Sequence, residues 1–169
     1  MFLKRKMMKM MRKKEVKIVI LGSANSGKTT TIENLLDGKN ERVTKIEHNG
    51  TTVALDYGNT VIDGERIHIF ATPGHKRFRF MREILSNGLD GAIVVIDSSV
   101  GVTATDADIL DKLKSGSIHH VIFANKQDIS PGIPESEHIK SSTKVIPTVA
   151  LSGEGIHDGL EELLKIMKN

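Results

Sequence analysis

The sequence predicts an α/β fold built on a doubly wound, mostly parallel sheet. Strand-like and helix-like segments alternate from residue 15 onward, and the connections between them are short. Residues 91–97 and 120–125 are continuous apolar runs, which are typical of parallel strands covered on both faces. One hairpin interrupts the series, so we expect one antiparallel strand.

Each element has its own signal in the sequence. The first strand is a β-branched run that a glycine stops, and the hairpin is marked by Asp63-Gly64. A helix between the two apolar runs follows from Ile109, Leu110 and Leu113, which share one helical face. The expected elements are strands at 16–21, 51–58, 66–71, 91–97, 120–125 and 144–151, and helices at 29–38, 106–115 and 159–167.

Length and composition describe a single globular domain. The chain has 169 residues, of which 38% are hydrophobic and 27% charged. It has no cysteine, which excludes disulfides and thiolate metal sites. No apolar run approaches the roughly 18 residues of a membrane span, and the N-terminus lacks the apolar core of a signal peptide. We therefore expect a cytoplasmic protein.

The positive charge is concentrated in residues 1–14, a basic, Met-rich N-terminal extension. These residues hold seven of the 24 basic side chains and no acidic one, which leaves 17 basic against 21 acidic residues, a charge of −4, for residues 15–169. We therefore expect no nucleic-acid binding by the domain. The apolar residues of the extension alternate with its cations at roughly helical spacing, so it could contact an anionic membrane or a partner. A solvated extension is the alternative.

The strongest motif is GSANSGKT at residues 22–29, between the first strand and the first helix. It matches G-x-x-x-x-G-K-S/T, whose backbone N–H groups surround phosphates at a helix N-terminus. Lys28 is expected to reach the β- and γ-phosphates, and Thr29 to place its hydroxyl on Mg²⁺. The predicted phosphate-binding residues are Gly22, Ser23, Ala24, Asn25, Ser26, Gly27, Lys28, Thr29 and Thr30.

A second motif, NKQD at residues 125–128, directly follows an apolar strand and predicts guanine as the base. Guanine presents two adjacent donors that one carboxylate can accept, whereas adenine would leave a carboxylate unpaired. Asp128 is thus the predicted guanine reader. Asn125 is expected to brace the loops, and the stem of Lys126 to cover the base.

On these motifs the chain from residue 15 to the end resembles the Ras-superfamily small GTPases. TTVALDYG followed by ATPGHKRF is most similar to an Arf-like prokaryotic branch, which includes the bacterial gliding-motility GTPase and its archaeal relatives. The resemblance implies a three-layer P-loop NTPase (small G-protein) fold. It also implies a six-stranded, mostly parallel sheet with one antiparallel strand, about five helices, and a GTP/GDP switch that uses Mg²⁺.

The resemblance also implies roles for residues outside the two motifs. Ala150 is expected to contact the guanine O6 through its backbone amide, with Leu151 beside it. Thr52 is expected to complete Mg²⁺ coordination in a switch formed by residues 39–52, and Thr51 is the alternative. A second switch is expected at residues 72–85. Arginines near both switches are candidates for stabilising the transition state, but no motif selects one, and a partner could supply it instead.

The family pattern D-x-x-G-Q corresponds here to residues 71–75, Ala-Thr-Pro-Gly-His. Gly74 matches the residue whose N–H senses the γ-phosphate, and His75 matches the residue that orients the attacking water. Translation GTPases resemble this chain in carrying a histidine after Pro-Gly. Ala71 replaces an aspartate that holds Mg²⁺ largely through water, so metal binding need not be lost. Asp56 is a conceivable substitute.

Two functions remain open at the level of sequence. The first is a GTP/GDP switch with slow hydrolysis that a partner stimulates; effector and activating proteins, by analogy of the roadblock type, are its expected partners. The second is a GTP-binding interaction module with little or no hydrolysis, similar to the β-subunit of the signal-recognition-particle receptor. Ala71 favours the module, whereas His75 and the complete phosphate loop favour the switch.

Overall fold

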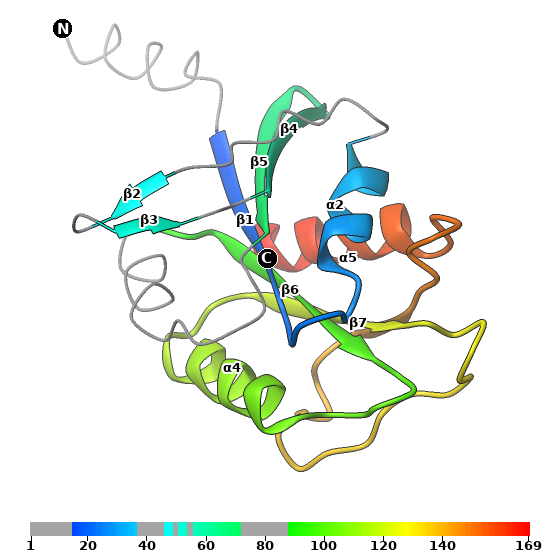
Figure 1. Cartoon of the computed structure of the whole chain (residues 1–169). Coiled ribbons are helices and arrows are strands. Elements are labelled where there is room, and N and C mark those ends of the chain that lie inside the picture. Colours follow the sequence, from blue (N-terminus) through cyan, green and yellow to red (C-terminus); the bar gives the residue numbers. More distant parts are fainter. Residues whose placement is uncertain (1–14, 37–45, 49–50, 54–55, 72–87) are drawn as a thin grey trace, which may run out of the picture.

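A computed structural model describes residues 15–36, 46–48, 51–53, 56–71 and 88–169. At the centre of the described part is a six-stranded sheet (Figure 1). The strand order is β4-β5-β1-β6-β7-β8. β4 pairs antiparallel with β5, and all other neighbours are parallel. The strands are β1 (Glu15–Leu21), β4 (Asp56–Ile62), β5 (Glu65–Ala71), β6 (Gly91–Asp97), β7 (His120–Asn125) and β8 (Val145–Pro147). The predicted sheet, with its one antiparallel strand, is confirmed.

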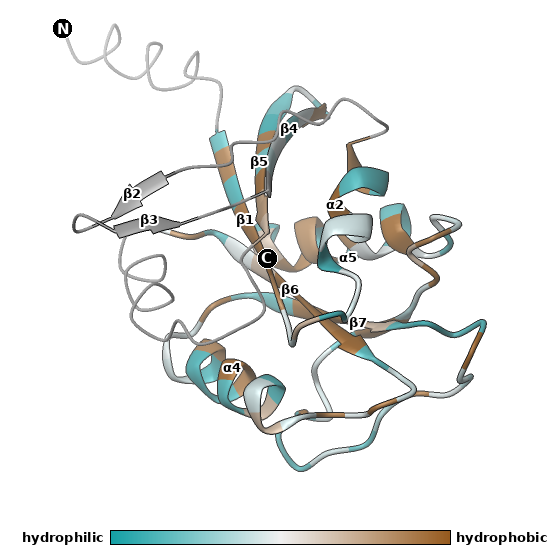
Figure 2. Ribbon diagram, in the orientation of Figure 1, coloured by the Kyte–Doolittle hydropathy of each residue, from teal (hydrophilic) through white to brown (hydrophobic). Residues whose placement is uncertain are grey.

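Helices cover both faces of this sheet and give three layers. On one face α2 (Lys28–Leu35) and α5 (Ile156–Lys168) pack in one apolar cluster with β1, β5, β6 and β7. On the other face α4 (Ala104–Ser115) packs in a second cluster. Figure 2 shows the apolar residues concentrated along the central strands. The described residues contain three helices, against about five expected for the whole chain, and none of the three is long and apolar enough to cross a membrane.

The β4–β5 hairpin has the turn that its sequence indicates. Asp63 and Gly64 are the only two residues between the strands, and their φ angles are 51° and 78°. A two-residue turn with both φ angles positive matches the right-handed twist of the flanking strands. The hairpin fixes the register that brings Asp56, at the start of β4, opposite Ala71, at the end of β5.

Several predicted boundaries were wrong. Residues 51–58 are not one strand: β3 (Thr51–Val53) pairs with β2 (Ile46–His48) in a separate two-stranded sheet, and β4 begins only at Asp56. A β-forming pattern indicates extended backbone but not which strand it will pair with. The strand expected at 144–151 is limited to β8, and the helix expected at 29–38 ends at Leu35. The last helix begins at Ile156, after Gly155 with a φ of 79°.

Candidate nucleotide-binding site

The site lies where β1, β6 and β7 end. Residues 22–27 form the loop between β1 and α2, and three of them have positive φ angles: Gly22 (149°), Asn25 (63°) and Gly27 (109°). A side chain at Gly22 would collide with the carbonyl oxygen of Val95, and one at Gly27 with the amide of Asn125. Both glycines are therefore required by close approach as well as by backbone conformation.

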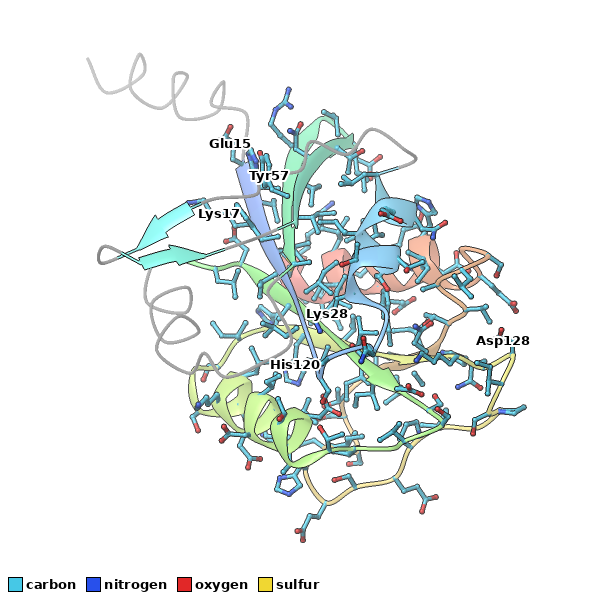
Figure 3. All side chains as sticks on the ribbon, in the orientation of Figure 1. Glu15, Lys17, Lys28, Tyr57, His120 and Asp128 are labelled. Atoms are coloured by element: carbon cyan, nitrogen blue, oxygen red, sulfur yellow. The ribbon has the colours of Figure 1, made fainter. Side chains whose placement is uncertain are left out.

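Lys28 begins α2 and is only 7% exposed (Figure 3). Its Nζ donates to the carbonyl oxygens of Gly22 (3.0 Å) and Ser23 (2.7 Å). Burial lowers the pKa of Lys28, and the nearby carboxylate of Asp106 partly offsets this. The ammonium group is thus held within the loop that is expected to receive phosphates.

Two observations indicate that a polyphosphate fits this loop. The hydroxyl of Ser26 is buried and has no hydrogen-bond partner in the described structure, which is costly unless a ligand or water satisfies it. Gly27 provides no side-chain cap for the N-terminus of α2, where the backbone N–H groups of a first helical turn and the helix dipole favour an anion. The loop therefore combines a buried hydroxyl that has no partner in the described structure with a buried cation.

Asn125, at the end of β7, joins three loops. Its amide nitrogen donates to the carbonyl oxygen of Ser26 (2.9 Å), and its amide oxygen accepts from the Thr148 hydroxyl (3.1 Å) and the Ala150 N–H (2.9 Å). The side chain is buried, with the residue 2% exposed. Asn125 therefore fixes the phosphate loop relative to the loop after β7 and the loop after β8.

Lys126 makes a second link to the loop of residues 22–27, called the phosphate loop for its expected ligand. It starts from the loop after β7 that carries Asp128, called the base loop for the same reason. Its Nζ donates to the carbonyl oxygen of Asn25 (2.9 Å) and to Asp97 Oδ2 (2.7 Å). Burial alone would raise the pKa of Asp97, but hydrogen bonds from Lys126 and Ser99 outweigh it and hold that pKa below its usual range. The lysine head group is thus anchored, which leaves its stem available to cover a base.

Asp128 is exposed on the loop that follows β7 (Figure 3). The preceding residue, Gln127, holds this loop: its amide nitrogen donates to the Ser98 hydroxyl (3.0 Å) and the Gly132 carbonyl (2.9 Å), and its amide oxygen accepts the Gly132 N–H (2.9 Å). A carboxylate on a braced loop is presented to a ligand at little entropic cost.

Ala150 and Leu151 follow the short β8 strand. The N–H of Ala150 already donates to Asn125, so a contact with guanine O6 would have to share or replace that bond. The carbonyl of Ala150 accepts from the side chain of Asn34 in α2. Leu151 is 82% exposed.

The residues expected to sense the γ-phosphate are only partly described. Gly74 and His75 lie outside the described residues. Thr52 lies in β3, where it pairs with Glu47. Ala71 is 4% exposed and packs in the same apolar cluster as Ile32 of α2, so its methyl group belongs to the core.

Sequence reasoning missed several contacts of this site. Asp106 in α4 binds the backbone and hydroxyl of Ser23, and Thr103 touches the same hydroxyl. The spacing of Thr103 and Asp106 is a detectable capping-box signal, but their contact with residue 23 has no local signal. Among the described residues, no three His, Asp or Glu side chains form a group that could hold a metal.

This fold and this site are those of a P-loop GTPase, and the chain is a GTP-binding protein. Residues 13–169 match the family model of the elongation factor Tu GTP-binding domain. The chain therefore belongs to that family of GTP-binding domains.

The chain is also similar to proteins of other organisms. The chain is 43% identical over 161 residues to an uncharacterised protein of Methanocaldococcus jannaschii, covering 94% of this chain and 99% of the relative. It is 26% identical to translation initiation factor IF-2 of Bacillus anthracis, covering 88% of this chain but only 23% of that factor.

Two solved structures show the same fold. The G domain of the FeoB iron transporter of T. maritima has a TM-score of 0.71 at 23% identity, covering 92% of this chain and 99% of that one. The Arl6 small GTPase of Trypanosoma brucei, bound to the nucleotide analogue GppNp, has a TM-score of 0.61 at 21% identity, covering 91% and 98%.

Replacing Asn125 tests its role as the junction of the site. In the nucleotide-free protein we expect Asn125→Ala to lower the free energy of unfolding by about 3 kcal/mol, because it leaves buried groups of two other loops unpaired. Urea unfolding measures this loss. Asn59→Ala, on the edge strand β4, is the matched control and should cost less than about 1 kcal/mol. Equal losses would show that Asn125 has no special role.

Proposed function

We propose that this protein is a GTP/GDP molecular switch with slow GTP hydrolysis that a partner stimulates. The observation that supports this most directly is that a phosphate loop with a buried lysine is joined, through Asn125 and Lys126, to a braced base loop carrying Asp128. The base and the phosphates of one nucleotide would thus be held by two loops that are hydrogen-bonded to each other.

The proposal assigns a role to each part of the site. Asp128 accepts from the two adjacent donors of guanine, and Lys28 exchanges its loop carbonyls for phosphate oxygens. Gly74 senses the γ-phosphate, and His75 orients the attacking water. Effector and activating proteins, including roadblock-type proteins, follow from the resemblance to the Arf-like prokaryotic branch. The proposed location is cytoplasmic, with residues 1–14 either solvated or in peripheral contact with an anionic membrane.

Mg²⁺ would be held by the hydroxyls of Thr29 and Thr52 together with the phosphates, and it would neutralise charge that develops on them. Ala71 cannot contribute a ligand. The β4–β5 register, however, puts Asp56 directly opposite Ala71, and Cα atoms of such antiparallel partners lie about 4.5–5.5 Å apart. We therefore infer that Asp56 supports the metal in place of the missing aspartate.

The role of Asp56 can be measured without hydrolysis. We expect Asp56→Asn to reduce the gain in GDP affinity that Mg²⁺ provides over EDTA by about tenfold, because a charged outer ligand is lost. Asp63→Asn, at the turn of the same hairpin, is the control, since asparagine tolerates its positive φ. An Mg²⁺ gain that Asp56→Asn leaves intact would remove Asp56 from the metal site.

The non-hydrolysing module is the second candidate, and the burial of Ala71 in the core favours it. Single-turnover hydrolysis of GTP by nucleotide-exchanged protein, with and without Mg²⁺, separates the two candidates. A switch should show slow, Mg²⁺-dependent turnover that His75→Ala reduces by about a hundredfold, the lower end of what a positioned general base contributes. His119→Ala, an exposed histidine before β7, should have no effect. Tight binding without any turnover would instead favour the module.

Base selection gives an independent prediction. We expect Asp128→Asn to weaken GDP binding at least about a hundredfold, because an amide cannot accept from both guanine donors. The same variant should gain affinity for xanthosine diphosphate, whose base carries a carbonyl where guanine has its amino group. Competition against a fluorescent nucleotide measures both changes, with Asp158→Asn on the surface of α5 as control. If GDP affinity is retained, Asp128 does not read the base.

A further inference from the structure

The N-terminus of α4 contacts the phosphate loop. Thr103 caps this helix: its hydroxyl accepts from the Asp106 N–H (3.1 Å), and Asp106 Oδ2 accepts from the Thr103 N–H (3.1 Å). This reciprocal pair is a capping box and accounts for the start of the helix. It uses only part of the bonding capacity of the Asp106 carboxylate.

The second carboxylate oxygen of Asp106 binds Ser23, which lies 83 residues earlier in the chain. Asp106 Oδ1 accepts from the backbone N–H of Ser23 (3.1 Å) and from its hydroxyl (2.9 Å). The Thr103 and Ser23 hydroxyl oxygens lie 2.5 Å apart. Since Ser23 gives its proton to Asp106, the Thr103 hydroxyl donates to Ser23. The network is closed, and Asp106 is only 1% exposed.

Ser23 is therefore held from two sides. Its N–H and hydroxyl are bound to Asp106, whereas its carbonyl oxygen accepts from Lys28 Nζ at 2.7 Å. Any shift of Ser23 would move one of the two carbonyl groups that hold the lysine. The buried carboxylate also attracts the buried ammonium group directly.

We propose that Asp106 is a positioning residue for phosphate binding: through Ser23 it holds the loop and Lys28 in the arrangement that receives the β-phosphate. This inference rests on the proposed binding of guanine nucleotides at the same loop. Asp106 itself need not touch the nucleotide. The N-terminus of α4 is thereby part of the binding site and not only the start of a helix on the opposite face of the sheet.

The measurement must distinguish a displaced phosphate loop from a protein that is merely destabilised by the loss of a helix cap. A variant that only loses stability lowers the apparent affinities for GDP and GMP by the same factor, because both ligands bind the folded fraction. A variant that disturbs the phosphate loop loses more affinity for GDP, whose β-phosphate depends on Lys28. The ratio of the GDP and GMP affinities therefore reports positioning alone.

The experiment measures this ratio for the full chain by competition against a fluorescent GDP analogue, at a temperature where circular dichroism shows each variant folded. Asp106→Asn is expected to reduce the ratio at least about tenfold, since the loss of a buried charged acceptor affects both Ser23 and Lys28. Asp108→Asn makes the same change on the same helix, at a partly exposed pair with Lys112, and should leave the ratio unchanged.

Ser23→Ala keeps the inference testable if Asp106→Asn does not fold. It removes the hydroxyl contact but keeps the backbone N–H bond, so the ratio should fall in the same direction but less. If each of the two variants that folds keeps the wild-type ratio of GDP to GMP affinity, the inference is wrong, whereas the proposed function is unaffected. Failure of the wild-type protein to bind GDP at all would remove the proposed function and this inference together.

Discussion

The site depends above all on one buried side chain, Asn125. Its amide group bonds the phosphate loop, through Ser26, to the loop after β8, through Thr148 and Ala150. A buried amide is stable only when these bonds are made, so the three loops are restricted to one relative arrangement. Lys126 adds a second bond from the base loop to the phosphate loop. The position of Asp128 relative to Lys28 follows from these constraints.

The topology of the sheet explains why these loops can meet. β1 lies between β5 and β6: the chain runs from β1 to the edge strand β4, returns to β5 beside β1, and then continues on the other side of β1 through β6, β7 and β8. Ligands of open α/β sheets bind at such a reversal point, beyond the carboxyl ends of the strands. The phosphate loop follows β1, and the base loop follows β7, two strands away. The sheet brings the loops to one edge, and side-chain hydrogen bonds then set their relative positions.

The sequence predicted the local features and missed most contacts between residues that are distant in the chain. The phosphate loop, the Asp63-Gly64 turn and the apolar strands β6 and β7 follow from neighbouring residues, and the structure has them where they were expected. The division of residues 51–58 between two sheets depends on pairing partners, which a strand pattern does not specify. The bonds of Asp106 to Ser23 and of Gln127 to Ser98 join residues far apart in sequence, so no spacing rule reveals them.

The alanine at the end of β5 changes the energetics of the site. Ala71 is buried against apolar residues of the core, where an ionised aspartate without a bound cation would cost several kcal/mol. A methyl group carries no such cost, so the end of β5 can pack in the same way whether or not Mg²⁺ is bound. If Mg²⁺ binds as proposed, it would stabilise the nucleotide complex without also being needed to neutralise a buried charge at the end of β5.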